Sequence, residues 1–321
     1  MVFLGLAVAL AIAFLVCWAM LAVGKHTGFV DRPDKEGLKI HSGSPVPLGG
    51  VAVMAGLHLG LTAAGAFDYA LFVATSIVWV VGLVDDRKGL APLWRVTASV
   101  LGGGALVVIG GFTSGLVAGI AGVALVVVAL NAVNLLDGLD ALAASVTAIG
   151  AVGLSAFAAT QGLSGAWTGA LLAAALVGFL VWNLPPARLF LGDNGAYVVG
   201  VTLAWLALRA SSDWITGVVG VALIGVPLLD LAATILRRTV ARAPLLTGDR
   251  DHSYDRLRQS GFSVGAVAAT YSLAQAVWVA VLISVSVLFG EVLAVVVALI
   301  LGGTIVLVFG LNRRQRMSAP G

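Results

Sequence analysis

Long apolar segments alternate with short polar segments along the whole chain. Eleven apolar stretches stand out, at residues 2–23, 49–66, 69–84, 97–113, 116–133, 141–160, 167–183, 196–210, 214–236, 263–289 and 292–311. They are too long for the strands of a membrane barrel, and they lack the alternation of apolar and polar residues that such strands show. The pattern therefore predicts an all-α, polytopic integral membrane protein with about eleven transmembrane helices.

The composition agrees with this fold class. The 321 residues are 60% hydrophobic and 10% charged, whereas a soluble domain carries about 25% charged residues. The chain has one cysteine, Cys17, so an intramolecular disulfide is excluded. No basic residue precedes the first apolar stretch, and Lys25 follows it, so we expect a retained helix rather than a signal peptide. We expect residues 1–321 to form a single membrane-embedded domain.

The basic residues are divided unevenly between the two sides that alternating spans define. Arg209 falls on one side, and the other 17 of the 18 Lys and Arg residues fall on the opposite side. Because basic loops stay in the cytoplasm, the N-terminus is predicted outside and the C-terminus inside a bacterial cytoplasmic (inner) membrane. The long loops (24–48, 85–96, 184–195 and 237–262) are then cytoplasmic, so we expect the site of activity to face the cytoplasm.

The densest group of polar side chains ends the fifth apolar stretch. Asn131, Asn134, Asp137 and Asp140 follow one another at intervals of three residues. On a helix, such steps keep neighbouring side chains near one face, and ionisable groups at a membrane boundary are functional candidates. The alternative is a polar helix end that solvates a loop, but three further polar stretches fall on the same side and favour a shared site.

Two adjacent carboxylates, Asp85 and Asp86, close the third apolar stretch. Their mutual repulsion can be offset by a divalent cation or by a bound basic group. Adjacent helical residues point about 100° apart, so one carboxylate can face a metal ion and the other a substrate group. The alternative is a solvated helix end that Arg87 and Lys88 neutralise.

A further acidic residue, Asp193, precedes the eighth apolar stretch. A Pro-Pro pair breaks the chain shortly after Asn183, and Gly192 and Gly195 flank Asp193. Asp193 is therefore expected near a helix N-terminus, where the helix dipole favours a carboxylate or a phosphate. An ordinary N-cap aspartate is the alternative.

Two cytoplasmic loops supply basic groups. In the first, Lys39 and His41 precede a segment rich in Pro and Gly and are candidates to contact an anionic substrate, although a solvated linker has the same composition. The loop at 237–262 is strongly basic, which suits phosphate groups or anionic lipid headgroups but is also what the topology requires. Within it, His252 lies among acidic residues and arginines that include Arg250.

Taken together, these motifs resemble the polyprenyl-phosphate N-acetylhexosamine-1-phosphate transferases, the MraY/WecA superfamily, over nearly the whole chain. The matching residues are His41, Pro45, Pro47, Gly49 and Gly50; Asp85, Asp86, Gly89 and Leu90; Asn131, Asn134, Asp137, Gly138 and Asp140; and Asn183, Pro186, Ala187, Phe190 or Leu191, Gly192, Asp193 and Gly195. Three positions depart from the WecA-like pattern: Tyr254 and Asp255 stand where it has histidines, and Leu48 stands where it has arginine.

The resemblance implies an Mg²⁺-dependent enzyme, with Mn²⁺ as the alternative ion. A sugar-1-phosphate, expected to be an N-acetylhexosamine such as GlcNAc, would pass from a UDP-sugar to polyprenyl phosphate, and UMP would be released. Asp193 is expected to be the principal metal ligand, with Asp86 sharing, and Asp85 to orient or deprotonate the lipid phosphate. The expected substrate-binding residues are Lys39, His41, Asn131, Asn134, Asp137, Asp140, Asn183, Arg250 and His252.

Two other functions compete with this interpretation. A lipid-phosphate-binding homologue without turnover would account for Tyr254 and Asp255. A transporter would use carboxylates in a cavity, but it favours charges near mid-bilayer and repeat symmetry, and the chain shows no internal repeat. The expected partners are the UDP-sugar, the polyprenyl phosphate and the bilayer, with no nucleic acid, and a homodimer stays open.

Overall fold

The computed structural model describes residues 1–31, 44–112, 115–163, 166–244 and 251–311. These residues are mainly helical, and their one recorded β-type pairing is an isolated bridge between Val46 and Leu189. The helices are α1 (Val2–Thr27), α2 (Gly49–Ala63), α3 (Tyr69–Lys88), α4 (Pro92–Ile109), α5 (Leu116–Leu136), α6 (Leu142–Thr160), α7 (Thr168–Asn183), α8 (Gly192–Arg209), α9 (Trp214–Leu223), α10 (Val226–Val240), α11 (Ser253–Gln259), α12 (Val264–Phe289) and α13 (Glu291–Leu311).

The lengths and apolar composition of these helices confirm an all-α, multi-pass membrane protein. In the described residues, α1, α3, α4, α5, α6, α12 and α13 are each long and apolar enough to cross a membrane, and α2 and α7 are shorter apolar helices. Each of the eleven predicted stretches coincides with a helix or a pair of helices. The number of crossings and their orientation stay predictions.

The ninth stretch differs from the expectation of one continuous helix over 214–236. It consists of α9 and α10, which meet at an angle of 84°. Gly225 at the break has φ 42° and ψ −106°, which is incompatible with a helix. Gln275 of α12 satisfies the freed backbone: it accepts from the Val226 N–H (2.8 Å) and donates to the Leu223 carbonyl (2.9 Å). Such partners are what a broken helix in a membrane requires.

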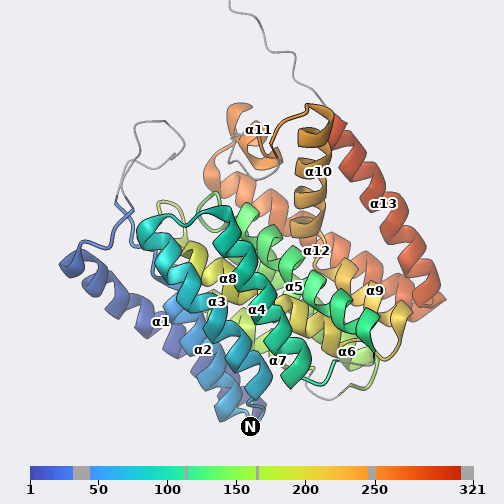
Figure 1. The fold of residues 1–321 in the computed structure, drawn as a ribbon, viewed down its shortest axis with the longest axis horizontal. Coiled ribbons are helices and arrows are strands. Elements are labelled where there is room, and N and C mark those ends of the chain that lie inside the picture. Colours follow the sequence, from blue (N-terminus) through green and yellow to red (C-terminus); the bar gives the residue numbers. More distant parts are fainter. Residues whose placement is uncertain (32–43, 113–114, 164–165, 245–250, 312–321) are drawn as a thin grey trace, which may run out of the picture.

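The helix α8 forms the centre of the bundle (Figure 1). Every residue of α8 from Asn194 to Ala207 is buried, and α8 packs against α2 to α7 and against α9. The approach of α3 depends on Gly82, because a Cβ there would lie 2.5 Å from the Asn194 Cα. This contact places the last turn of α3 beside the first turn of α8.

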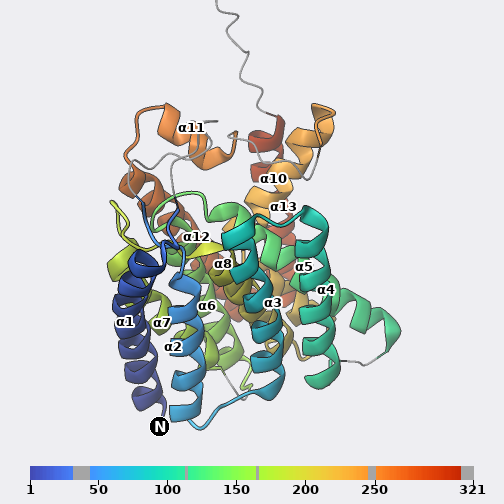
Figure 2. The ribbon, with the colours of Figure 1, turned by 60° about the vertical axis from the view of Figure 1, so that its left-hand side comes forward.

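The polar segments gather at one end of the bundle. In Figures 1 and 2 the N-terminus lies at the bottom, whereas α11 and the C-terminal end of α10 lie at the top. The C-terminal ends of α3 and α5 and the first turn of α8 share that upper end, because their polar residues contact one another and Tyr254 of α11 bonds the Leu135 carbonyl of α5. All the candidate residues that the structure describes therefore come from this end.

Candidate active site

The carboxylate of Asp86 caps the first turn of α8. It accepts from the Asp193 N–H (2.8 Å), from the Asn194 N–H (3.0 Å) and from the Asn194 side-chain amide (2.6 Å). The residue just before α8, Leu191, provides no side-chain cap, so Asp86 supplies from α3 the acceptors that the exposed N–H groups of a helix end need. Asn194 also donates to the Pro47 carbonyl (3.0 Å), which ties the segment before α2 to the same point.

The adjacent carboxylate, Asp85, points in another direction, as the helical geometry predicts. Asp85 is buried, and its oxygens lie 2.7 Å from the Arg95 Nε and 2.8 Å from the Tyr197 hydroxyl, which donates to it. The Leu90 N–H donates to it as well (2.7 Å). Asp85 thus holds the guanidinium of Arg95, which comes from α4, in a fixed position.

Asp193 lies between Asn134 of α5 and Arg95 of α4. Its Oδ1 accepts a hydrogen bond from the Asn134 side-chain amide, and its Oδ2 lies 3.9 Å from an Nη of Arg95. Its side chain is partly exposed, with 22% of its surface accessible. Asp193 is therefore oriented by α5 and α4 and still reachable by a ligand.

A second reachable carboxylate, Asp137, follows the last turn of α5. It is partly buried and lies close to the backbone N–H of Gly192. Removal from water raises the pKa of the Asp137 carboxyl well above its usual value, and the charges of Asp193 and Asp86 raise it further. Three carboxylates thus repel one another here, which is the condition that a bound cation relieves.

The remaining residues of the two motifs join the loops around this group. The Asp140 carboxylate accepts from the Ala187 N–H (3.0 Å). Asn183 is buried, accepts from the Ala141 N–H (2.9 Å) and donates to the Leu189 carbonyl (2.9 Å). Both polar groups of Asn183 are engaged in positioning the loops, so its predicted contact with substrate stays a prediction.

Asn131 differs from the other members of its motif. Its amide donates to the Val127 carbonyl of its own helix (2.7 Å). Among the described residues, Asn131 makes no hydrogen bond to the carboxylates. The three-residue spacing therefore brings Asn134 to the site but leaves Asn131 about one helical turn away from it.

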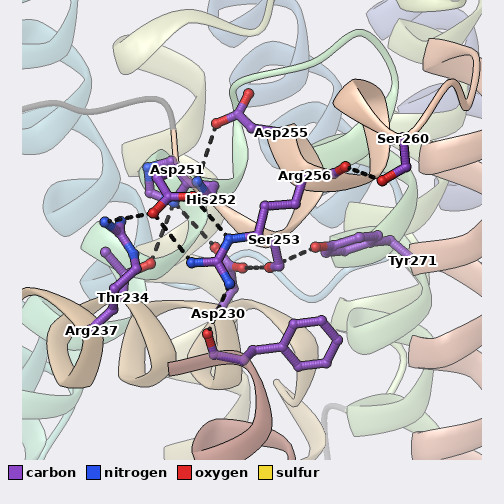
Figure 3. Close-up of polar contacts among 11 residues, drawn as sticks. Asp230, Thr234, Arg237, Asp251, His252, Ser253, Asp255, Arg256, Ser260 and Tyr271 are labelled. Atoms are coloured by element: carbon purple, nitrogen blue, oxygen red, sulfur yellow. Dashed lines mark hydrogen bonds and ion pairs between the residues drawn. The ribbon is translucent and has the colours of Figure 1, made fainter. Parts of the chain in front are cut away.

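A second polar cluster holds α11 against α10 and α12 (Figure 3). Asp230 of α10 is buried and accepts a hydrogen bond from the Ser253 hydroxyl, which in turn accepts from the Tyr271 hydroxyl (2.7 Å). The His252 Nδ1 lies 3.6 Å from the other Asp230 oxygen and 3.4 Å from the Thr234 hydroxyl. These contacts fix the start of α11.

Ion pairs strengthen the same attachment. Asp251 lies 3.5 Å from an Nη of Arg237 in α10 and 2.9 Å from the Nε of Arg256 in α11. Arg256 also donates to the Phe309 carbonyl of α13 (3.3 Å). The short α11, which would be unstable alone, is thus held by three other helices.

Tyr254 connects this cluster to the carboxylates. Its ring stacks on His252, with centroids 5.1 Å apart and planes 6° from parallel. Its hydroxyl donates to the Leu135 carbonyl (3.2 Å), and its ring packs against Gly138. Burial raises the pKa of the Tyr254 phenol well above its usual value, and the charges of Asp255 and Asp230 raise it further, so the hydroxyl remains a donor.

The residues at this site fit a divalent cation that is held by few protein ligands. Mg²⁺ characteristically binds one or two carboxylates and takes its other ligands from water and substrate phosphates. Asp193 and Asp137 are the reachable carboxylates, while both oxygens of Asp86 already accept from α8. In the described part of the chain, no three acidic, His or Cys side chains form a complete metal site by themselves.

Three predicted residues fall outside the described part of the chain, and two residues at the site were not predicted. Lys39, His41 and Arg250 lie outside the described residues. Arg95 and Tyr197 were not among the predicted site residues, although Tyr197 lies four residues after Asp193 and so on the same helix face. That spacing was a usable signal for Tyr197, whereas the sequence gives none that pairs Arg95 with Asp85.

Comparison with known proteins places this geometry in a family. A family model described as glycosyl transferase family 4 matches residues 69–211, which include α3 to α8. A protein of Streptomyces coelicolor, whose name assigns it provisionally to the glycosyltransferases, is 33% identical over 282 residues, which cover 84% of this chain and 68% of that protein. This chain belongs to glycosyl transferase family 4.

Two other relatives in the family carry more specific names. The undecaprenyl-phosphate alpha-N-acetylglucosaminyl 1-phosphate transferase of Thermotoga maritima is 28% identical over 256 residues, covering 76% of this chain and 77% of that protein. The decaprenyl-phosphate N-acetylglucosaminephosphotransferase of Mycolicibacterium smegmatis is 28% identical over 311 residues, covering 81% of this chain and 75% of that protein. The resemblance to the MraY/WecA superfamily that the motifs indicate is therefore confirmed.

Proposed function

We propose that this protein transfers a sugar-1-phosphate from a UDP-sugar to polyprenyl phosphate. The first candidate for the transferred group is N-acetylglucosamine-1-phosphate. An oxygen of the lipid phosphate bonds to the phosphorus attached to the sugar, the bond from that phosphorus to UMP breaks, and UMP leaves. The observation that carries the proposal is the convergence of Asp193, Asp137 and Asn134 with Arg95 at one end of a membrane-embedded bundle. The names of the two relatives support the choice of substrates.

Phosphoryl transfer depends mainly on positioning and on neutralising charge, and the site residues suit both tasks. Asn134 and Arg95 orient the Asp193 carboxylate, and Asp86 fixes the helix end that carries it. Arg95, held by Asp85, contributes positive charge beside the phosphates. Because Asp85 is enclosed by its partners, its predicted action on the lipid phosphate requires a rearrangement of the Arg95 side chain.

A divalent cation, Mg²⁺ with Mn²⁺ as the alternative, completes the proposal. When bound, it would neutralise the phosphate oxygens. Asp193 would hold it, with Asp137 or Asp86 as the second carboxylate. Asp137 and Asp140 are otherwise proposed to hold the nucleotide together with Asn134, and His252 the diphosphate together with Arg250 and Lys39.

The proposed location follows from the charge distribution in the sequence. We place the active site on the cytoplasmic face of a bacterial inner membrane, with eleven crossings and the N-terminus outside. The donor then comes from the cytosol, and the polyprenyl tail stays in the bilayer. The product would serve the synthesis of a cell-envelope polysaccharide or of peptidoglycan.

The test is UMP release by the purified full-length protein. It is supplied with polyprenyl phosphate, Mg²⁺ and a panel of UDP-sugars, with and without a chelator. Asp193→Asn should lower the rate by about 100-fold or more, as the loss of one preorganised electrostatic group does. Glu291→Gln is the matched control, because Glu291 starts α13 and pairs with Gln161, away from the carboxylates.

Each result decides between named functions. The transferase is supported if UMP release needs both polyprenyl phosphate and Mg²⁺ and is abolished by Asp193→Asn. The UDP-sugar that gives UMP is then the donor. No release from any sugar by folded protein would favour a lipid-phosphate-binding homologue. In that case Tyr254→His with Asp255→His tests whether the altered α11 segment is the cause.

A further inference from the structure

A second polar site lies apart from the carboxylates, in a groove between α1 and the end of α7. The groove has a volume of about 880 Å³. The last turns of α1 form one wall, Trp182 and Arg188 form the other, and the segment Ser44–Val46 closes one side. The groove therefore opens where two helices end, at a boundary of the membrane-embedded bundle.

The chemistry of the groove changes along its length. Lys25, His26 and Arg188 supply its basic groups, and none of the described residues that line it is acidic. Trp18 and Leu21 of α1 form an apolar part nearer the middle of the bundle. Such a surface accepts a molecule with an anionic head and an apolar body.

One of the basic groups, Arg188, lies against aromatic side chains. The Arg188 guanidinium lies over the Trp182 ring, 5.9 Å from its centroid, and Trp182 packs against Phe14 at 5.3 Å. The buried indole N–H of Trp182 has no hydrogen-bond partner among the described residues. Packed aromatic side chains thus form this side of the groove.

The groove and the carboxylate site share loops but differ in charge. Arg188 lines the groove, while the neighbouring Ala187 N–H bonds Asp140. Val46 likewise lines the groove, while the neighbouring Pro47 carbonyl accepts from Asn194. Among the described residues, the charged groups beside a phosphate in the groove would all be basic, so its binding would not depend on a divalent cation.

We propose that this groove binds an anionic phospholipid of the surrounding membrane. The phosphate would lie against Lys25, His26 and Arg188, and an acyl chain would lie along Trp18 and Leu21. A phospholipid is the occupant that the position favours, because α1 is an exposed membrane helix, tryptophans favour the level of the lipid headgroups, and basic pockets between membrane helices bind anionic headgroups.

The experiment measures lipid binding to the full-length protein in detergent. Delipidated protein is titrated with dioleoylphosphatidylglycerol or with the neutral dioleoylphosphatidylcholine, and binding is read from the rise in Tm and from lipid phosphorus that stays bound. The wild type should bind the anionic lipid selectively. Lys25→Gln with Arg188→Gln should weaken that binding about 25-fold, at about fivefold per basic residue.

Two variant pairs keep the test specific. Lys25→Arg with Arg188→Lys keeps the charge and should keep most of the binding. Lys88→Gln with Arg242→Gln removes two exposed charges outside the groove and should leave the binding unchanged. Equal binding of the anionic lipid by the wild type and by the Gln pair at the groove overturns the proposal.

Polyprenyl phosphate has the same chemistry, so a third arm separates the two sources. The KM for polyprenyl phosphate in the UMP assay should stay the same in the Gln pair at the groove. A rise in that KM with unchanged phosphatidylglycerol binding would assign the groove to the acceptor and overturn the phospholipid. Binding can be measured without turnover, so a failure of the proposed transferase function does not affect it.

Discussion

Replacing Asp86 by asparagine separates its role as a helix cap from a role in binding a ligand. In the structure one Asp86 oxygen accepts from the Asp193 N–H, and the other accepts from two N–H groups of Asn194. An asparagine side chain has one carbonyl oxygen, so it can keep the two bonds to Asn194 only by turning its NH₂ toward the Asp193 N–H. The Asp193 N–H would then lose its acceptor.

The expected loss of stability is the sum of opposing effects. A buried donor left without a partner costs about 1–3 kcal/mol, and loss of a negative charge at a helix N-terminus costs about 0.3–1 kcal/mol. Removal of the Asp86 charge also relieves repulsion with Asp193 and Asp137, which offsets part of this. We expect a net loss of about 1–3 kcal/mol, which at about 2–4 °C per kcal/mol lowers Tm by roughly 2–12 °C.

The assay compares Asp86→Asn with Asp193→Asn in two measurements, thermal unfolding in detergent and UMP release. Asp193 accepts no hydrogen bond from the helix end, and the loss of its charge beside the α8 N-terminus is offset by the relief of its repulsion with Asp86, so its variant should melt near the wild-type Tm while losing activity. Asp86→Asn should lose both, and a lower assay temperature should restore part of its activity. The reasoning is refuted if Asp86→Asn melts like the wild type and is as inactive as Asp193→Asn, because Asp86 would then act on the ligand and not on the helix.

Three further predictions concern other parts of the site. Without a divalent cation, the wild type should lose stability as the pH rises from the usual aspartate pKa to the raised pKa of Asp137, because in that range the folded state holds the proton more tightly than the unfolded chain. Asp137→Asn should abolish this loss. The same pH profile of Tm in both proteins would contradict the prediction. Gly82→Ala should cost about 1–3 kcal/mol by overpacking, since its Cβ would meet the Asn194 backbone at 2.5 Å, whereas Gly104→Ala, where no atom lies within 4 Å, should leave Tm nearly unchanged; equal melting of the two variants is the adverse result. Tyr254→Phe should cost about 1 kcal/mol for the lost hydrogen bond, measured by thermal unfolding, and an unchanged Tm would show that this bond does not hold α11.

The convergence of the acidic motifs could be predicted from the sequence because membrane topology and helical periodicity suffice for it. Alternating spans place Asp86, Asn134 and Asp193 on one side, and the structure joins them by hydrogen bonds. Spacing within one helix also separates Asp85 from Asp86 correctly. What each carboxylate contacts could not be predicted, because the partners come from helices that are distant in the sequence.

The features that were missed depend on backbone geometry and on pairings between helices. Arg95 counts as a loop charge in any topology argument, and only the packing of α4 on α3 turns it toward Asp85. The break at Gly225 lies within an apolar run, and hydropathy does not register a change in φ and ψ. The side chains of Gln275 and Trp278 that make the break tolerable come from α12, about fifty residues later.

The central position of α8 bears on how the protein is made. By length and composition α8 is not among the helices that could cross a membrane independently, because its first turn carries Asp193 and Asn194. The acceptors that satisfy this turn, on Asp86 and Pro47, belong to segments that leave the ribosome earlier. We therefore expect α8 to enter the membrane by packing between the helices that precede it, rather than by inserting independently into lipid. A chain that stops before Gly192 would lack the helix against which α2 to α7 pack, so those helices should expose the surfaces that α8 covers.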